Sequence, residues 1–186
     1  RTTMFKPDMI VLDLGLPDMD GKEVVRRIRE WSQVPILILT ARDQEQEKID
    51  ALDAGADDYV TKPFGGGELM ARMRVSMRRA ARSGDEPIIS CGGLSIDLAQ
   101  RRVLVEGREV KLTPTEYDIM KVLAQHAGKV LTHKQLLKAV WGTAFNEDTH
   151  YIRVYIGQLR RKIEANPTQP RYIITESGVG YRLMGK

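Results

Sequence analysis

The pattern of apolar and polar positions changes in character near residue 82. Before it, two almost continuously apolar runs, MIVLD at 9–13 and PILILT at 35–40, are typical of strands covered on both faces of a parallel sheet. DYVT at 58–61 predicts a third strand. Helical spacing of apolar residues predicts helices at 21–31, 46–55 and 67–82. The resulting βαβαβα order predicts an α/β domain with right-handed crossovers.

The second half of the chain has a different pattern. Residues 94–112 predict two or three short antiparallel strands. Two capping boxes, TPTE at 113–116 and THKQ at 132–135, indicate helix starts, and a long helix is predicted from Thr149 to Ala165. Residues 172–184 predict a hairpin around a glycine turn. Helices followed by a hairpin favour an α+β winged helix-turn-helix.

The polar, turn-rich stretch RSGDEP separates the two patterns. We therefore predict one domain at 1–82, a linker at 83–88 and a second domain at 89–186. A chain of 186 residues with 42% hydrophobic and 29% charged residues suits two small globular domains. No apolar run has the length of a membrane span, and the single cysteine, Cys91, excludes an internal disulfide. A cytoplasmic protein with no membrane partner is expected.

The basic charge of the chain is concentrated in the second half. Residues 1–84 hold 14 basic and 14 acidic residues, so the net charge of +4 belongs to residues 85–186. Clustered basic charge indicates a polyanionic partner. A solvated helix face would account for the charge equally well.

Polar side chains stand at the ends of the three predicted parallel strands. These are Asp13, Thr40 and Lys62, and the carboxyl ends of neighbouring strands converge in open parallel sheets. A carboxylate, a hydroxyl and an ammonium in one crevice suit a phosphoryl group, which Asp13 would accept as nucleophile. Taken one at a time, each is explained as an ordinary residue at a strand end.

Several motifs carry a resemblance to a known family. IVLDLGLPDMDG, LILTAR and AGADDYVTKPF closely resemble the receiver domain of two-component response regulators, which has a flavodoxin-like fold. LTPTEYDIMKVLAQHAGKVLTHKQLLKAVWG, HYIRVYIGQLRRKIE and TESGVGYR resemble the DNA-binding domain of the OmpR/PhoB family. The resemblance covers essentially the whole chain. It implies a non-enzymatic transcription regulator that dimerises and binds promoter DNA at tandem or palindromic half-sites, with a sensor histidine kinase and RNA polymerase as partners.

The resemblance also assigns roles at the strand ends. It implies that Asp13 is the phosphoacceptor and, with the carbonyl of Gly15, a ligand of Mg²⁺. It places the switch and phosphate-binding groups at Thr40, Tyr59 and Lys62, and it implies a cis peptide bond after Lys62.

The sequence departs from the receiver pattern at its start. A complete receiver has five βα units, whereas three are recognisable here, which suggests N-terminal truncation or residues that precede Arg1. The acidic pair that normally completes the Mg²⁺ site is missing, because Asp8 precedes its strand and Asp18 and Asp20 lie in the following loop. We therefore expect Mg²⁺ binding in the intact receiver, and little or no metal or phosphate uptake by this chain.

Two other functions were weighed against the phosphorylation-controlled regulator. One is a constitutive DNA-binding regulator whose remnant receiver serves only for protein interaction. The other is an enzyme that uses Asp13 as a phosphate-accepting nucleophile. The enzyme needs a nearby acid to protonate its leaving group, and the glycine at position 15 argues against it.

The resemblance further implies a dimer surface on the last two receiver helices and the strand between them. It places three charge pairs across that surface: Lys48 with Glu68, Asp58 with Arg72, and Asp57 with Arg79. Exposed pairs of this kind contribute about 0–1 kcal/mol each, so they would set register more than affinity. Ordinary helix-surface charges are the alternative.

The helix from Thr149 has two distinct faces. One is an apolar stripe that should pack inward: Ile152, Tyr155, Ile156, Leu159 and Ile163. The other suits base edges and phosphates in a DNA groove: His150, Arg153, Val154, Gly157, Gln158, Arg160 and Arg161. Further DNA contacts are expected outside the helix, from Thr132, Trp141, Arg171, Gly178, Tyr181 and Arg182. A surface helix with scattered charges is the alternative. The loop at 141–150 resembles the segment that touches RNA polymerase in this family.

Overall fold

The computed structural model describes residues 6–41, 43–81, 86–142 and 149–185, except for the side chain of Arg79. The chain divides into two compact units, Arg1–Arg82 and Ser83–Lys186. Within the described ranges, no helix combines the length and apolar character needed to cross a membrane.

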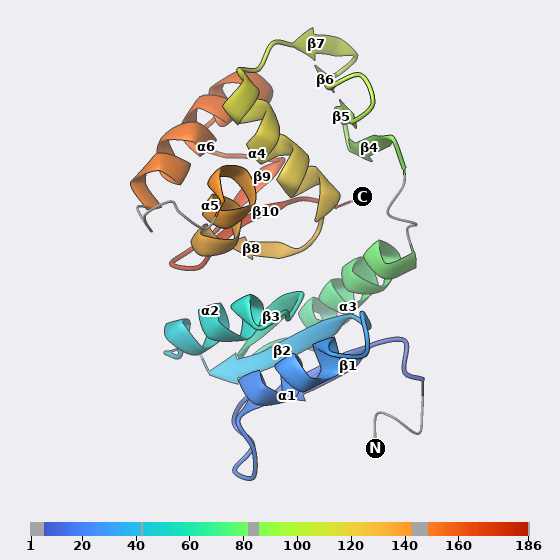
Figure 1. Ribbon diagram of the computed structural model, residues 1–186, viewed down its shortest axis with the longest axis vertical. Coiled ribbons are helices and arrows are strands. Elements are labelled where there is room, and N and C mark those ends of the chain that lie inside the picture. The colour runs from blue at the N-terminus through green and yellow to red at the C-terminus, as the bar shows by residue number, and fades with distance from the viewer. Residues whose placement is uncertain (1–5, 42, 82–85, 143–148, 186) are drawn as a thin grey trace. The chain divides into compact units, whose positions relative to one another are not determined.

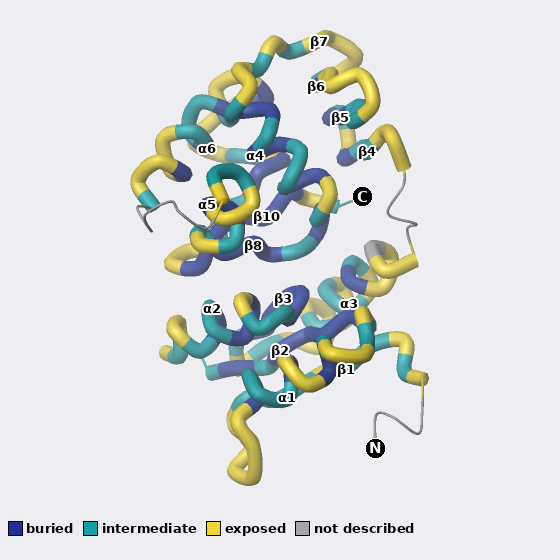
Figure 2. The backbone as a smooth tube through the Cα atoms, in the orientation of Figure 1, coloured by how far each residue is buried: buried dark blue, intermediate teal, exposed yellow. Residues whose placement is uncertain are grey.

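The first unit is a small α/β domain (Figure 1). Its sheet is parallel in the order β1-β2-β3, with bounds Ile10–Asp13, Ile36–Ala41 and Asp58–Lys62. Three helices alternate with the strands: α1 (Gly21–Arg29), α2 (Glu45–Asp53) and α3 (Gly66–Ala81). The central strand β2 carries the core, since Ile36, Leu37 and Ile38 are fully buried (Figure 2). The predicted α/β class is confirmed, and each helix lies within two residues of its predicted range.

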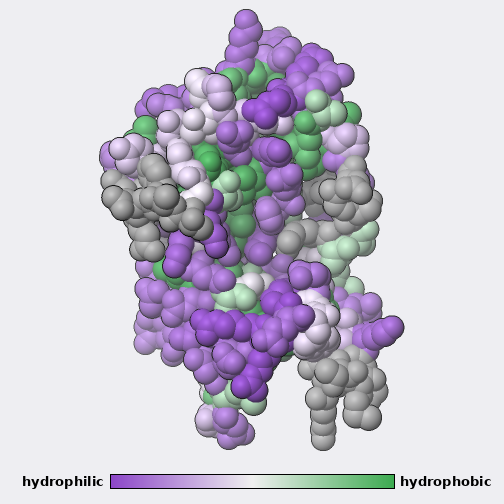
Figure 3. Space-filling view, viewed as in Figure 1, coloured by the Kyte–Doolittle hydropathy of each residue, from purple (hydrophilic) through white to green (hydrophobic). Residues whose placement is uncertain are grey.

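Helix α1 shows how sequence pattern becomes a half-buried helix. Asp20 caps it by accepting a hydrogen bond from the Lys22 amide at 3.0 Å. Val25 and Ile28 are buried, whereas the opposite face is charged. The surface over α1 is accordingly strongly hydrophilic (Figure 3). This amphipathic arrangement orients α1 on the sheet and leaves the loop before it exposed.

In the parts of the second unit that the structure describes, there are two antiparallel sheets and three helices (Figure 1). The four-stranded sheet runs in the order β4 (Ile88–Cys91), β5 (Leu94–Asp97), β6 (Arg102–Val105), β7 (Arg108–Val110). The three-stranded sheet runs in the order β8 (Val130–Thr132), β10 (Gly180–Leu183), β9 (Ile173–Glu176). The helices are α4 (Pro114–Gln125), α5 (His133–Trp141) and α6 (Thr149–Ile163). The predicted winged helix-turn-helix is confirmed.

Strand β8 has no counterpart among the predicted elements. It consists of three buried residues whose last member, Thr132, also caps the next helix. Such a short apolar run carries no periodicity of its own, so only its pairing with β10 makes it a strand. That pairing is close, because a Cβ at Gly180 would lie 1.9 Å from the carbonyl oxygen of Leu131.

Both predicted capping boxes are present. The Thr113 hydroxyl accepts from the Glu116 amide at 3.3 Å, and the Glu116 carboxylate accepts from the Thr113 amide at 3.0 Å. The Thr132 hydroxyl accepts from the Gln135 amide at 3.0 Å, and the Gln135 side chain accepts from the Thr132 amide at 2.9 Å. These reciprocal bonds satisfy backbone donors at the helix starts and fix where α4 and α5 begin.

Candidate functional site

Asp13 and Lys62 meet at the carboxyl edge of the parallel sheet. Asp13 ends β1 and Lys62 ends β3, with β2 between them. The Lys62 ammonium donates a hydrogen bond to Asp13 Oδ2, and the Gly15 amide donates to Asp13 Oδ1 at 2.8 Å. The Asp13 side chain keeps 31% of its surface exposed, so it is open to a donor from solution. The structure thus brings together two of the three strand-end groups that the sequence singled out.

The surroundings of Asp13 favour its charged form. The hydrogen bond from Lys62 and the Gly15 amide lower the pKa of the Asp13 carboxyl below its ordinary value. The carboxylate is therefore ionised at neutral pH, as a nucleophile must be.

Thr40 and Tyr59 lie on the same sheet but are buried. Thr40 follows Leu39, which pairs with Asp13, and its hydroxyl donates to the Gln44 side chain at 3.4 Å. Tyr59 is 8% exposed, with the Lys48 ammonium 5.4 Å from its ring centroid. The predicted cis peptide bond after Lys62 is confirmed. The roles of Thr40 and Tyr59 as switch residues stay predictions.

Few metal ligands are gathered near Asp13. Among the described residues there is no group of three or more His, Cys, Asp or Glu side chains that could hold a metal ion. Asp18 and Asp20 instead line an open pocket of about 390 Å³ beside the start of α1, where Asp20 is the helix cap. Asp13 and the carbonyl of Gly15 supply only part of an octahedral oxygen set, so this part of the chain fits Mg²⁺ incompletely.

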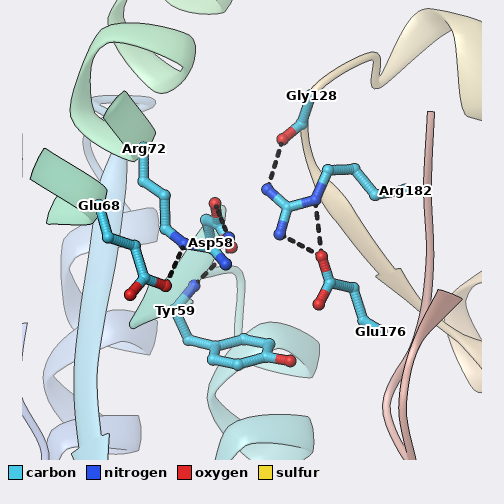
Figure 4. Close-up of polar contacts among 7 residues, drawn as sticks. All are labelled: Asp58, Tyr59, Glu68, Arg72, Gly128, Glu176 and Arg182. Atoms are coloured by element: carbon cyan, nitrogen blue, oxygen red, sulfur yellow. Dashed lines mark hydrogen bonds and ion pairs between the residues drawn. The ribbon is translucent and has the colours of Figure 1, made fainter. Parts of the chain in front are cut away.

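Two carboxylates of the predicted dimer surface are engaged within the chain. Asp58 is 1% exposed, and both its oxygens accept from Arg72 Nη1 at 3.2 Å (Figure 4). Arg72 Nε also donates to Glu68 at 3.3 Å. Asp58 and Arg72 pair between β3 and α3 of one chain, and their predicted pairing across two protomers stays a prediction.

Asp57 has a similar internal role. It is 6% exposed, and its Oδ2 accepts from Arg29 Nη2 and from the Ile36 amide, each at 2.8 Å. It joins α1 to the start of β2, which a sequence pattern does not reveal. Its predicted partner Arg79 has a side chain outside the described residues, so that pairing stays a prediction.

The two faces of α6 are arranged as predicted, except that the Arg160 guanidinium is bonded to β9. Four members of the apolar stripe are buried, Ile152, Ile156, Leu159 and Ile163, and Tyr155 is partly buried against Trp141. The opposite face is open: His150, Arg153, Val154 and Arg161 are exposed, and Gly157 and Gln158 are partly exposed. This face combines positive charge with small and apolar side chains, a composition suited to a DNA groove.

Two predicted DNA-binding arginines point into the protein instead. The Arg160 guanidinium donates to the Ile173 carbonyl at 2.7 Å and to the Thr175 hydroxyl at 2.8 Å. Arg182 is 7% exposed. Its Nε donates to Glu176 at 2.9 Å and its Nη1 to the Gly128 carbonyl at 3.3 Å (Figure 4). As a direct DNA contact, the prediction for Arg182 is wrong, because its guanidinium is buried against internal acceptors. Arg160 is partly exposed and bonds β9 through Nε and Nη2, so its role as a DNA contact stays a prediction.

Thr132 and Tyr181 are also internal. Thr132 is 1% exposed, and its hydroxyl caps α5. Tyr181 is 5% exposed, with the His133 ring 5.4 Å and the Arg160 guanidinium 5.8 Å from its ring. Burial removes both from direct contact with DNA and corrects the sequence-based assignment. Trp141 is partly buried, whereas Arg171 and Gly178 are exposed and stay candidates.

His133 is a titratable residue of the second unit that the sequence pattern did not single out. It is the first residue of α5 and stacks edge-on against Tyr181. Burial, and then the positive charge of Arg153, lower the pKa of His133, so its ring is neutral at neutral pH. Its position directly after a helix cap was the only signal in the sequence.

Comparisons with known proteins agree with this geometry. Residues 1–74 match the family described as response regulator receiver domain, and residues 107–183 match the family described as transcriptional regulatory protein, C terminal. The chain is 53% identical over 180 residues to the KDP operon transcriptional regulatory protein KdpE of Escherichia coli K12, covering 96% of this chain and 80% of that protein. It is 49% identical over 178 residues to the transcriptional regulatory protein KdpE of Mycobacterium tuberculosis H37Rv, covering 95% and 79%.

A solved structure supports the same assignment. The response regulator DrrB of Thermotoga maritima, described as an OmpR/PhoB homolog, is 33% identical with a TM-score of 0.50, covering 98% of this chain and 83% of that one. The matching receiver and DNA-binding domains and the close relatives lead to one conclusion. The chain belongs to the OmpR/PhoB family of two-component response regulators.

Proposed function

We propose that this response regulator accepts a phosphoryl group on Asp13 and reads promoter DNA with the exposed face of α6. The observation that carries the first part is the pairing of Asp13 with Lys62 at the open edge of the parallel sheet. The second part is supported by the amphipathic division of α6 beside a hairpin.

The phosphoryl transfer follows from the groups at the sheet edge. An ionised Asp13 oxygen attacks the phosphorus of a phosphohistidine on a sensor kinase, the P–N bond breaks, and the histidine leaves with its electron pair. Lys62 lies against the oxygen of Asp13 and is placed to pair with an incoming phosphoryl oxygen. The exposed edge admits the donor, and the lowered pKa of Asp13 keeps the nucleophile unprotonated.

Mg²⁺ would be held partly by Asp13 and the carbonyl of Gly15, and it would neutralise charge on the phosphoryl oxygens. Lys62 supplies the one positive charge that the described residues place on Asp13 itself. We therefore expect phosphorylation of this chain to be slow.

Intact mass spectrometry tests the proposed phosphoacceptor. The chain is incubated with acetyl phosphate and Mg²⁺, beside Asp13→Asn and Asp8→Asn as a matched carboxylate control. We expect a slow gain of one phosphoryl group in the parent and in Asp8→Asn, and none in Asp13→Asn. An equal gain in Asp13→Asn, or none in the parent, contradicts the proposal for this chain.

The DNA-reading face is proposed to contain Arg153, Val154, Gly157, Gln158 and Arg161. Arginine and glutamine have donor geometries that match guanine and adenine edges in the major groove. His150 lies on the same face at the start of the helix, and Arg171, Trp141 and Gly178 are proposed to contact the backbone from the flanking segments.

Salt-dependent binding tests the reading face. Arg161→Gln should relax base preference and weaken binding, whereas Arg27→Gln on the exposed face of α1 removes the same charge from the other unit and should leave DNA binding unchanged. The logarithm of affinity should fall linearly with the logarithm of salt concentration. A flat salt response, or equal effects of the two substitutions, contradicts the assignment.

We also propose that α2, β3 and α3 form a dimer surface. Met70 and Met77 of α3 are 50% and 42% exposed, and large apolar side chains are common at such surfaces. Glu68 and Arg72, which pair with each other, would lie at this surface, and so would Lys48, whose ammonium lies over the Tyr59 ring. RNA polymerase is proposed to contact the segment 141–150, of which residues 143–148 lie outside the described residues.

A further inference from the structure

Arg160 of α6 and Glu164, the residue directly after α6, bond the outer edge of β9. This strand lies at one edge of its sheet, with β10 on one side only. On the other side, the Ile173 amide donates to Glu164 Oε1 at 3.0 Å, and the Ile173 carbonyl accepts from Arg160 Nη2 at 2.7 Å. The backbone groups of an edge strand are otherwise left to solvent. Here the long helix supplies the partners that another strand would supply.

Glu164 is an unusual residue for its place directly after the C-terminus of α6. A carboxylate at a helix C-terminus is disfavoured by the negative end of the helix dipole. Glu164 is nevertheless 7% exposed and accepts from three consecutive amides, of Arg171 at 2.7 Å, Tyr172 at 2.8 Å and Ile173 at 3.0 Å. Charge-assisted bonds to three converging donors offset the unfavourable dipole. The carboxylate therefore joins the end of α6 to the start of β9.

Arg160 makes the second connection one helical turn earlier. Its Nε and Nη2 both donate to the Ile173 carbonyl, at 3.2 Å and 2.7 Å, and Nη2 also donates to the Thr175 hydroxyl at 2.8 Å. Arg161, the next residue, is exposed. The two adjacent arginines therefore differ in their contacts. Arg160 bonds the hairpin, whereas Arg161 is exposed to solvent.

We propose that Glu164 and Arg160 are positioning residues for DNA binding, which hold the hairpin of β9 and β10 at a constant position relative to the reading face of α6. Neither touches DNA in this role. They hold the helix and the turn at 177–178 in one fixed arrangement. Both can then bind a duplex without losing further conformational entropy. The inference rests on the proposed DNA contacts of α6.

The two substitutions at these positions separate positioning from simple electrostatics. Glu164→Gln removes a negative charge from a basic unit, which by charge alone should strengthen binding to a polyanion. Loss of positioning should instead weaken binding, because an amide oxygen holds the three backbone donors less strongly than a carboxylate does. Arg160→Lys keeps the positive charge but loses the planar guanidinium that donates to both the Ile173 carbonyl and the Thr175 hydroxyl.

The test uses the full chain and a duplex selected by the parent from a random pool, with affinity measured by fluorescence anisotropy over a range of salt. Glu164→Gln and Arg160→Lys should each weaken binding about tenfold, the scale of one well-placed base contact, with an unchanged salt slope. Glu109→Gln removes an exposed carboxylate on β7 and is the matched control, with parental or slightly tighter binding. Hydrogen exchange at the amides of 171–173 should accelerate in both variants, while the amides of α4 stay protected.

Parental or tighter binding by folded Glu164→Gln overturns the proposal. So does an Arg160→Lys variant that matches the parent in affinity and in exchange at 171–173, since Arg160 would then act as a charge. If the amides of α4 also exchange rapidly in Glu164→Gln, that variant is unfolded. The binding and exchange of Arg160→Lys then test the proposal. Arg161→Gln separates this inference from the proposed function. If the Arg161→Gln variant keeps the parental base preference, the proposed DNA-reading face of α6 is contradicted. The exchange rates at 171–173 still report on the positioning contacts of Glu164 and Arg160.

Discussion

The ion pair of the buried Glu116 with the partly exposed Lys162 side chain provides a sharp test of how the second unit holds α6. Glu116 is 2% exposed, and its Oε2 accepts from Lys162 Nζ at 2.6 Å and from the Thr113 amide at 3.0 Å. Glu116→Gln keeps the capping box, because glutamine also serves at that position, and it removes only the charge. The substitution therefore isolates the ion pair that joins the start of α4 to the end of α6.

The expected cost follows from this geometry. A hydrogen bond to a charged group contributes about 1.5–3 kcal/mol. The Lys162 side chain keeps 36% of its surface exposed, and solvent screening reduces the contribution to about 1–2 kcal/mol. We expect Glu116→Gln to lower the free energy of unfolding by that amount at pH 7. Glu116→Ala also loses the cap and should cost about 1 kcal/mol more.

The cost should depend on pH in a defined direction. Burial alone would raise the pKa of Glu116, but the hydrogen bonds from Lys162 and the Thr113 amide outweigh it and lower that pKa. Because the folded pKa is lowered, the stabilisation is fully present above the ordinary value of 4.5 and is lost as pH falls through the folded value. The difference between parent and Glu116→Gln should therefore shrink below about pH 4.5.

Urea denaturation followed by the fluorescence of Trp141 measures the second unit. Replacing Trp31, which is 50% exposed in the first unit, with phenylalanine removes the other tryptophan at little cost. Lys162→Met is the complementary variant, because it leaves the Glu116 carboxylate buried without its cation. A difference between parent and Glu116→Gln that is absent at pH 7, or that grows on acidification, refutes the assignment of the lowered pKa to this pair.

Two further outcomes are expected. Gly180→Ala should lower the free energy of unfolding of the second unit by about 1–3 kcal/mol or more in urea denaturation, because its Cβ would meet the Leu131 carbonyl oxygen; parental stability would show that β8 and β10 can separate. The lowered pKa of His133, caused by burial and then by Arg153, means that the unfolded state binds its proton more readily. The unfolding free energy should therefore fall between pH 7 and pH 5 more steeply in the parent than in His133→Gln, and parallel profiles in calorimetry would contradict this.

The comparisons favour the transcriptional regulator over the other two functions weighed from the sequence. Both curated relatives are described as transcriptional regulatory proteins, and the matched families are a receiver and a transcriptional regulator domain. They do not favour a constitutive DNA binder with a remnant receiver. The partly exposed, ionised Asp13 beside Lys62 is the arrangement that the proposed phosphoacceptor requires.

The sequence alone determined the two fold classes, the alignment of Asp13 with Lys62 and the order of the elements apart from β8. Each of these depends on local or periodic information: apolar runs predict buried strands, capping boxes predict helix starts, and parallel strands bring their carboxyl ends to one edge. The faces of α6 followed from the same kind of reasoning, because an apolar stripe specifies which side is buried.

Only the tertiary structure decided which charged side chains are available. Arg160 and Arg161 are adjacent and chemically identical, yet one bonds β9 and the other is exposed. Asp57, Asp58 and Arg182 are likewise held by partners distant along the chain. Burying a charge is favourable only when donors and acceptors from other elements surround it. That condition depends on how the elements pack, and so no pattern along the sequence could distinguish a buried arginine from one that is free to meet DNA.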